Sequence, residues 1–171
     1  CHEHSIRVFP PERHPHYSQA LNFLSKHLEP SHRVLDVGCN TGVMTAEIAK
    51  LVREVIGVDY SDEAILTARE THRAENLSFE ACDAIKYSTG LNERFDVVVL
   101  SHIVEHLDDP VDLLAPLSRC CQFVYFEVPD FEHNVLNHHR ESLQRGLIYT
   151  DVDHRFELDR KDAVTLLERC S

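Results

Sequence analysis

Short apolar runs alternate with amphipathic stretches along this chain of 171 residues. The apolar runs are rich in β-branched and aromatic residues, which favour strands. They predict strands over residues 34–37, 55–58, 77–81, 95–100 and 122–128. Apolar residues at helical spacing, with Ser61 and Asp159 as N-caps, predict helices around and between these strands. The helices are expected over residues 16–28, 43–51, 62–74, 110–119 and 159–169.

Strand and helix patterns alternate, and the strands are apolar enough to be buried on both faces. This order predicts an α/β fold: a doubly wound, mainly parallel sheet with helices on both faces. In such sheets, ligands bind beyond the carboxyl ends of the strands. We therefore expect the functional residues to lie directly after the strands.

The turn after the first predicted strand has glycines at positions 38 and 42. Glycine lets the backbone approach a ligand closely, and the start of the next helix offers free N–H groups. The GxxxG spacing does not match the GxGxxG fingerprint of dinucleotide sites. Asp36, beside the turn, disfavours a pyrophosphate and favours a cationic ligand.

The stretch 34–42, VLDVGCNTG, resembles motif I of the class I S-adenosylmethionine (SAM) dependent methyltransferases, usually (V/I)LD(V/L)GCGTG, and the similarity extends over residues 33–128. The resemblance implies a Rossmann-like fold with SAM as the cofactor. Asn40 stands where glycine is usual, and asparagine tolerates left-handed backbone better than most residues. The cofactor-binding residues that the resemblance implies in this turn are Asp36, Gly38, Cys39, Asn40 and Gly42.

The ends of the next strands match further motifs of this family. Asp59, followed by Tyr60, stands where the family holds the ribose hydroxyls, and a carboxylate can accept from both of them. Asp83 and Ala84 resemble the adenine-contacting segment, in which the carboxylate would accept from the exocyclic amine and the Ala84 amide would face the ring. Ser101 opens a segment that resembles the loop after the fourth strand. The resemblance implies that these five residues complete the cofactor site.

The resemblance implies one SAM-dependent methyltransferase domain over residues 1–171. We expect an N-terminal helix over 16–28, a cofactor-binding core over 33–128, a substrate or cap region over 129–158 and a last helix over 159–169. The family fold normally has seven strands, and we expect the C-terminal sixth and seventh to be lacking here. The uncovered fifth strand would leave an exposed edge, which a homodimer or a further domain would cover.

His102, Glu105 and His106 place three potential metal ligands just after the fourth predicted strand. Imidazole and carboxylate ligands suit Zn, Mn, Fe or Co better than Mg. The stretch resembles the loop of ubiquinone-type O-methyltransferases. It also resembles the small-RNA 2′-O-methyltransferases, which have ExxEH here and a histidine ligand in a later HDHxFE-like stretch, matched by His154. This resemblance implies a divalent metal at His102, Glu105, His106 and His154. In the alternative, hydrogen bonds from Glu105 and His106 order the loop, and His154 packs.

Methyl transfer to an oxygen requires the hydroxyl to lose its proton, which a histidine base or a metal can bring about. The candidate catalytic residues are Glu105, His106 and His133. Histidines near the fourth and fifth strands favour O-methylation of a small-molecule acceptor. Two alternatives stay open: a metal-dependent 2′-O-methyltransferase acting on RNA 3′ ends, and a non-catalytic SAM-binding scaffold.

The composition narrows the range of partners and compartments. The formal net charge of −12 argues against nucleic acid as a partner, although it leaves room for a local basic groove. No apolar run approaches the ~20 residues of a membrane span, so we expect no membrane association. The six cysteines show no CxxC spacing, which predicts reduced, mostly buried thiols in a cytoplasmic protein.

Overall fold

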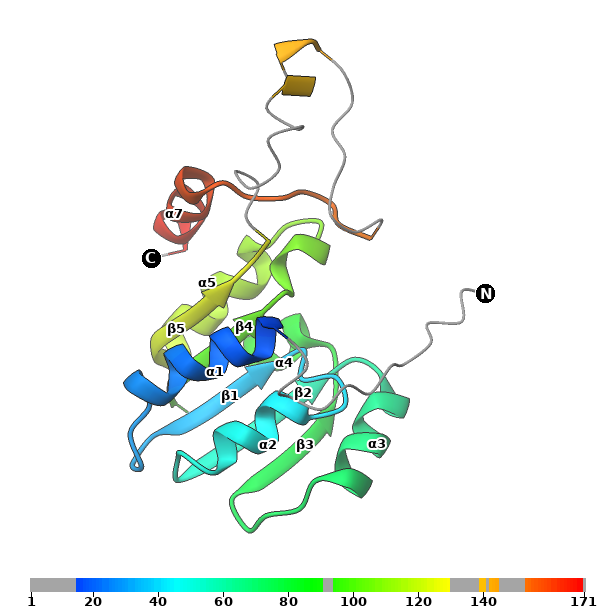
Figure 1. The fold of residues 1–171 in the computed structure, drawn as a ribbon, viewed down its shortest axis with the longest axis vertical. Coiled ribbons are helices and arrows are strands. Elements are labelled where there is room, and N and C mark those ends of the chain that lie inside the picture. Colours follow the sequence, from blue (N-terminus) through cyan, green and yellow to red (C-terminus); the bar gives the residue numbers. More distant parts are fainter. Residues whose placement is uncertain (1–14, 91–93, 130–138, 141, 145–152, 171) are drawn as a thin grey trace.

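The structure, a computed structural model, describes residues 15–90, 94–129, 139–140, 142–144 and 153–170. These residues form a five-stranded sheet in the order β3-β2-β1-β4-β5, with helices on both faces (Figure 1). Every pair of neighbouring strands is parallel. The predicted doubly wound α/β fold is therefore confirmed, and no further strand joins this sheet within the described ranges.

The elements begin and end close to the predicted positions. The strands are β1 (Arg33–Val37), β2 (Glu54–Asp59), β3 (Leu77–Ala81), β4 (Phe95–Ser101) and β5 (Cys121–Glu127). The helices are α1 (Pro15–His27), α2 (Val43–Ala49), α3 (Asp62–Thr71), α4 (Ala84–Gly90), α5 (Val111–Cys120) and α7 (Arg160–Arg169), with a short 3-10 helix η2 (Val104–His106).

The central strand, β1, is buried on both faces, as its continuous apolar run predicts. Val34 of β1 packs in one cluster with Leu24 of α1 and Ile48 of α2. The next residue, Leu35, packs in the opposite cluster with Leu113 of α5. Each side chain buried in this way contributes about 1.5–3 kcal/mol through loss of apolar surface from water. Helices α1, α2 and α3 thus cover one face, while α4 and α5 cover the other and α7 packs against α5 (Figure 1).

Two helices end earlier than their sequence pattern indicates. Helix α3 ends at Thr71 because His72 is already extended, with φ −120° and ψ 127°. The Asn76 side chain then donates to the carbonyl oxygens of Ala49 and Val52, at 2.8 and 2.9 Å. These bonds use the carbonyl at the end of α2 and tie the α3–β3 connection to it. The Asn76 side chain therefore caps the end of α2.

Helix α4 was absent from the predicted elements. It begins after Asp83, whose carboxylate accepts from the Lys86 N–H at 3.0 Å and whose carbonyl accepts from the Tyr87 N–H at 2.8 Å. Asp83 is therefore an N-cap, a role that aspartate favours. Asp83, two residues after the end of β3, is the signal in the sequence for this helix, beside the role toward adenine that the resemblance implies.

The carboxyl ends of the strands meet at one edge of the sheet. The parallel register places Asp59 of β2 beside Ala81 of β3, and Ser101 of β4 beside Glu127 of β5. The outer edge of β5 has no neighbouring strand among the described residues, and its Phe123 is 57% exposed. In the described part of the chain, every helix is too short or too polar to cross a membrane.

Candidate functional site

The turn between β1 and α2 requires glycine at two positions. Gly38 and Gly42 have φ of 74° and 76°, which L side chains rarely adopt. A Cβ at Gly42 would lie 2.5 Å from Phe79 Cζ, and one at Gly38 would overlap the Ile103 side chain. Asn40 is also left-handed, with φ of 49°, as asparagine tolerates. The turn that the sequence singled out is therefore a tight, close-packed loop at the carboxyl end of β1.

Asp59 holds this turn to the end of β2. One carboxylate oxygen accepts from the Asn40 N–H at 2.8 Å, and the other accepts from the Ser61 N–H at 2.9 Å. Each carboxylate oxygen has a second lone pair, so Asp59 can still accept from a ligand hydroxyl. The half-buried carboxylate thus fixes two loops of the candidate cofactor site before any ligand arrives.

Asp36 is the buried acid of the site. It is 1% exposed, and its carboxylate accepts a 2.6 Å hydrogen bond from the Thr45 hydroxyl. Burial raises the pKa of Asp36 to about 7; the Thr45 bond opposes this shift, and the Asp59 charge adds to it. The neighbouring Cys39 thiol is also buried, and burial raises its pKa so that it stays protonated. Cys39 therefore lines the turn as an apolar group.

The remaining predicted cofactor residues take different roles. Tyr60 is 86% exposed and leaves its ring open beside Asp59. One carboxylate oxygen of Asp83 accepts the hydrogen bond that caps α4. Ala84 is the first residue of that helix and is half-buried. The Ser101 hydroxyl donates to a Glu127 carboxylate oxygen at 2.8 Å.

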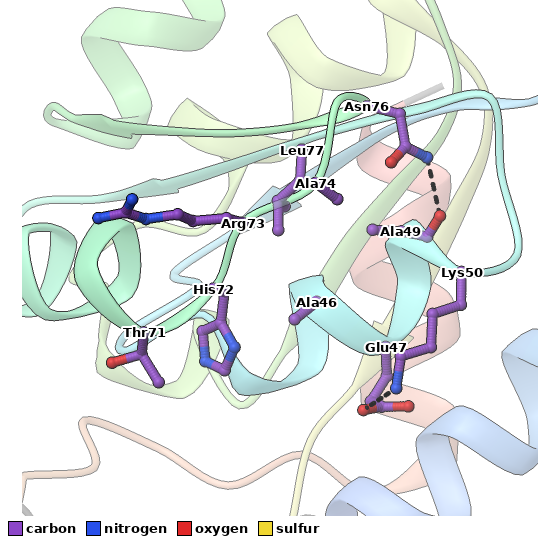
Figure 2. A pocket seen from close by; sticks show the side chains of 10 residues that line it. All are labelled: Ala46, Glu47, Ala49, Lys50, Thr71, His72, Arg73, Ala74, Asn76 and Leu77. Atoms are coloured by element: carbon purple, nitrogen blue, oxygen red, sulfur yellow. Dashed lines mark hydrogen bonds and ion pairs between the residues drawn. The ribbon is translucent and has the colours of Figure 1, made fainter.

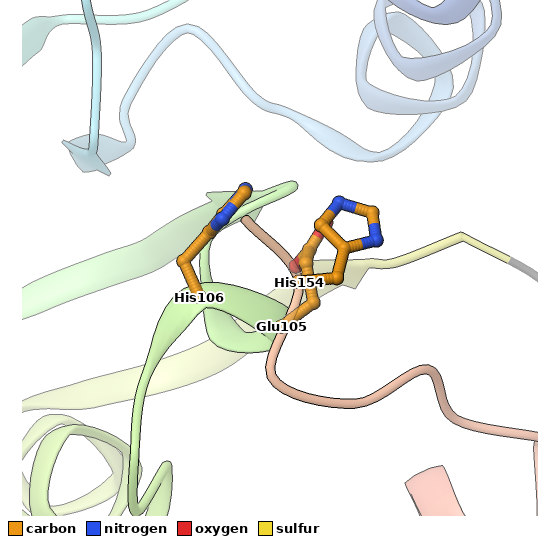
Figure 3. Close-up of side chains that lie close together, drawn as sticks. All are labelled: Glu105, His106 and His154. Carbon is orange, nitrogen blue, oxygen red and sulfur yellow. The ribbon is translucent and has the colours of Figure 1, made fainter. Parts of the chain in front are cut away.

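Three of the four predicted metal ligands lie together beyond β4. One ligand atom from each of Glu105, His106 and His154 lies within 4.8 Å of the others (Figure 3). The His106 and His154 rings meet edge to face, with centroids 4.9 Å apart. The Arg155 N–H donates to the Glu105 carbonyl at 2.8 Å and so ties the two segments together. The structure therefore brings His154 to the loop after β4, as the resemblance implied.

His102, the fourth predicted ligand, is not part of this group. Its Nδ1 lies 3.2 Å from Glu105 Oε1, and the hydrogen bond to this carboxylate raises the pKa of His102. Its backbone is left-handed, with φ of 55°, an uncommon conformation that concentrates at functional sites. His102 therefore holds Glu105 rather than joining the three-residue group. His133, the third predicted catalytic residue, lies outside the described residues.

The sequence interpretation missed two acidic residues at this edge. Glu127 ends β5 and accepts from Ser101 and from the Tyr125 hydroxyl, at 2.8 and 3.2 Å. Glu157 is 7% exposed, and its Oε1 lies 3.1 Å from His154 Nδ1. The spacing of His154 and Glu157 repeats that of His102 and Glu105, which was the available signal.

A shallow cavity lies away from this edge, between the end of α2 and the α3–β3 connection (Figure 2). It has a volume of about 470 Å³ and is lined by Lys50, His72 and Asn76 among others. None of the predicted site residues lines it. The candidate functional site is therefore the carboxyl edge of the sheet and not this cavity.

The fold and the turn define the class of the chain as a class I, Rossmann-like SAM-dependent methyltransferase domain. The family model described as "Methyltransferase domain" matches residues 11–165. The chain therefore belongs to the methyltransferase domain family. Among curated relatives, the mitochondrial ubiquinone biosynthesis O-methyltransferase of Homo sapiens is 35% identical over 96 residues, which cover 53% of this chain and 25% of the relative.

Solved structures share the fold at lower sequence identity. The YcgJ protein of Bacillus subtilis superposes with a TM-score of 0.68 at 21% identity, covering 90% of this chain and 68% of that protein. Magnesium protoporphyrin IX methyltransferase of Synechocystis, solved with bound S-adenosylhomocysteine (SAH), gives 0.66 at 16% identity, covering 90% and 70%. The chain spans between 25% and 43% of the length of the first curated relatives it matches.

Proposed function

We propose that this chain binds SAM at the carboxyl ends of β1 and β2 and transfers its methyl group to an oxygen of a small-molecule acceptor. The observation that carries the proposal is the position of Glu105, His106 and His154 directly beyond β4. Strand β4 pairs with β1, which leads into the glycine turn. An acceptor held by this group would lie at the same edge as the cofactor. Relatives named ubiquinone biosynthesis O-methyltransferases support oxygen as the accepting atom.

The residues around the turn fit SAM. The exposed ring of Tyr60 offers a surface on which an adenine can stack, and Asp59 has lone pairs left for ribose hydroxyls. Asp36 supplies a buried negative charge when it is ionised, which favours a cationic ligand. Bound SAH in the Synechocystis enzyme, which shares the fold, supports this assignment.

A divalent metal fits the part of the site beyond β4 that Glu105, His106 and His154 form. The Glu105 side chain is 1% exposed, and its Oε2 has no hydrogen-bond partner among the described residues. An unpaired buried carboxylate oxygen is costly, and a cation beside it would remove that cost. Two imidazoles and one carboxylate suit Zn, Mn, Fe or Co. When bound, such a metal would lower the pKa of an acceptor hydroxyl.

His106 can also act as the base in the absence of a metal. Its Nδ1 lies 3.3 Å from the Asp153 carbonyl, to which it donates, and this bond leaves Nε2 to accept the proton of an acceptor hydroxyl. The acceptor oxygen then forms the new C–O bond while the C–S bond of the cofactor breaks and its electron pair stays on sulfur. His106 cannot be a metal ligand and the general base at the same time. Metal analysis of the untagged protein decides between the two roles, because bound metal supports the ligand and its absence supports the base.

Methyl transfer to a panel of hydroxylated aromatic compounds tests the proposed function. The chain is incubated with SAM and each acceptor, and mass spectrometry records the added methyl group. Transfer to an aromatic hydroxyl that a chelator abolishes supports a metal-dependent reaction, whereas transfer that a chelator leaves unchanged supports His106 as the base. Transfer only to RNA ends would instead support a 2′-O-methyltransferase that acts on RNA 3′ ends. SAH binding without any transfer would support a non-catalytic SAM-binding scaffold.

Two further assignments belong to this proposal. A reducing compartment such as the cytoplasm is supported by the described cysteines, which are all free thiols. The open edge of β5, with its exposed Phe123, supports coverage by a second copy or a further domain. Sedimentation analysis tests the dimer, and a monomer at all concentrations would contradict it.

A further inference from the structure

Two histidine–glutamate pairs of identical spacing meet at the candidate metal site. In the loop after β4, His102 Nδ1 lies 3.2 Å from Glu105 Oε1. In the segment before α7, His154 Nδ1 lies 3.1 Å from Glu157 Oε1. Each pair contributes one member to the metal group, Glu105 from the first and His154 from the second. The other two members, His102 and Glu157, therefore contact a residue of the metal group without belonging to it.

The contact between His154 and Glu157 constrains the imidazole. Both side chains are buried, with 7% and 0% of the side chain exposed. An ionised carboxylate only accepts hydrogen bonds, so the ring nitrogen that faces it, Nδ1, must carry the proton. Nε2 is then the nitrogen whose lone pair can bind a cation. The contact thus selects one tautomer and one orientation of the ring.

We propose that Glu157 is the positioning residue for His154, holding its Nε2 lone pair toward Glu105 and His106. The inference rests on the metal site of the proposed function. A histidine that binds a metal generally donates its other ring N–H to a carboxylate or carbonyl, which also makes the ligand more basic. Burial of Glu157 strengthens this effect, because the hydrogen bond from the neutral imidazole to the carboxylate is shielded from water.

Calorimetry with Zn²⁺ alone, on the ligand-free chain, tests this role directly. Glu157→Gln keeps the shape of the side chain and removes its charge. It should weaken Zn²⁺ binding roughly 10-fold or more, as loss of such partners typically does. Glu54→Gln is the matched control, because Glu54 is also paired, with Arg33, but lies at the amino end of β2. Equal affinity of wild type and Glu157→Gln would overturn the inference and leave the metal site standing.

A double-variant cycle separates positioning from a general effect on folding. In the His154→Ala background, Glu157→Gln should change Zn²⁺ affinity less than about 2-fold, because its partner is gone. An undiminished loss in that background would show that Glu157 acts on the fold instead. If the wild-type chain binds no Zn²⁺, the metal part of the proposed function fails, and this inference fails with it.

The tautomer of His154 provides a readout that needs neither metal nor activity. Nitrogen NMR of the wild-type chain, above the pH at which the imidazole is neutral, should show a protonated Nδ1 and an unprotonated Nε2. The same spectrum of Glu157→Gln should show a mixture of tautomers. A wild-type ring protonated on Nε2 would overturn the inference even if Glu157→Gln failed to fold.

Discussion

The Asp36 carboxylate accepts a 2.6 Å hydrogen bond from the Thr45 hydroxyl, and both side chains are buried. Thr45 lies on α2, so this bond joins the end of β1 to the helix that follows the glycine turn. This bond lowers the pKa of Asp36 by less than burial raises it, so the pKa is raised to about 7. Ionised Asp36 is therefore unfavourable in the ligand-free protein, whereas a cation beside it would favour the charged form.

Asp36→Asn is expected to stabilise the ligand-free chain above pH 7. Because the pKa of Asp36 is raised on folding, the native state binds more protons than the unfolded state between about pH 4 and pH 7. Wild-type stability therefore falls as the pH rises through this range. The full effect is at most about 4 kcal/mol, since one pKa unit corresponds to about 1.4 kcal/mol. Urea unfolding at pH 5 and pH 8 measures it, and a pH-independent difference between the proteins would contradict it.

The same substitution is expected to weaken SAH binding about 10-fold or more at pH 8, because interactions with a charged group contribute about 1.5–3 kcal/mol. Wild-type affinity should fall as the pH decreases through about 7 and Asp36 takes up a proton, whereas the variant should not respond in that range. Calorimetric titration measures both. Asp62→Asn, at an exposed position on α3, is the control. Unchanged SAH affinity in Asp36→Asn would remove Asp36 from the cofactor site.

Asp59→Asn is expected to destabilise the chain by about 1–3 kcal/mol, because an amide offers one acceptor oxygen to two backbone N–H groups. The N–H of Asn40 or of Ser61 then faces a donor. Thermal unfolding measures the loss, again with Asp62→Asn as the control. A variant as stable as wild type would show that the two loops do not depend on this carboxylate.

His106→Ala and His133→Ala are each expected to lower methyl transfer by about 100-fold or more, the usual contribution of a general base, and to leave SAH affinity nearly unchanged. His106 is exposed and belongs to the group beyond β4 rather than to the glycine turn. His27→Ala, at the end of α1, is the control for loss of a histidine. A large loss of SAH affinity in either variant would reassign that residue to the cofactor site.

Much of the sheet edge could be predicted because its residues follow strands directly. Strands buried on both faces appear as apolar runs, and the residues after them mark the edge. Gly38 and Gly42 were predictable because their backbone conformation excludes other residue types. His154 was found only through the resemblance, since its approach to Glu105 depends on the path of the chain between them.

The residues that the sequence interpretation missed act through tertiary contacts. Glu127 meets Ser101 because β5 pairs with β4 in one particular register. Asp83 was assigned to adenine, yet its local role is to cap α4, since the same carboxylate chemistry serves both purposes. His102 has the chemistry of a ligand, but its Nδ1 contacts Glu105 and the residue stays outside the three-residue group. Residue type alone does not separate these roles.

Ile103 occupies the space that any side chain at Gly38 would fill. Ile103 lies between His102 and Glu105, so the glycine turn and the histidine-bearing loop are in direct contact. A ligand that shifts one of them must repack the other, and such coupling is reciprocal by thermodynamic necessity. The two parts of the site are therefore expected to be coupled, so that a ligand in either part changes the affinity of the other part by the same factor, whichever ligand is added first.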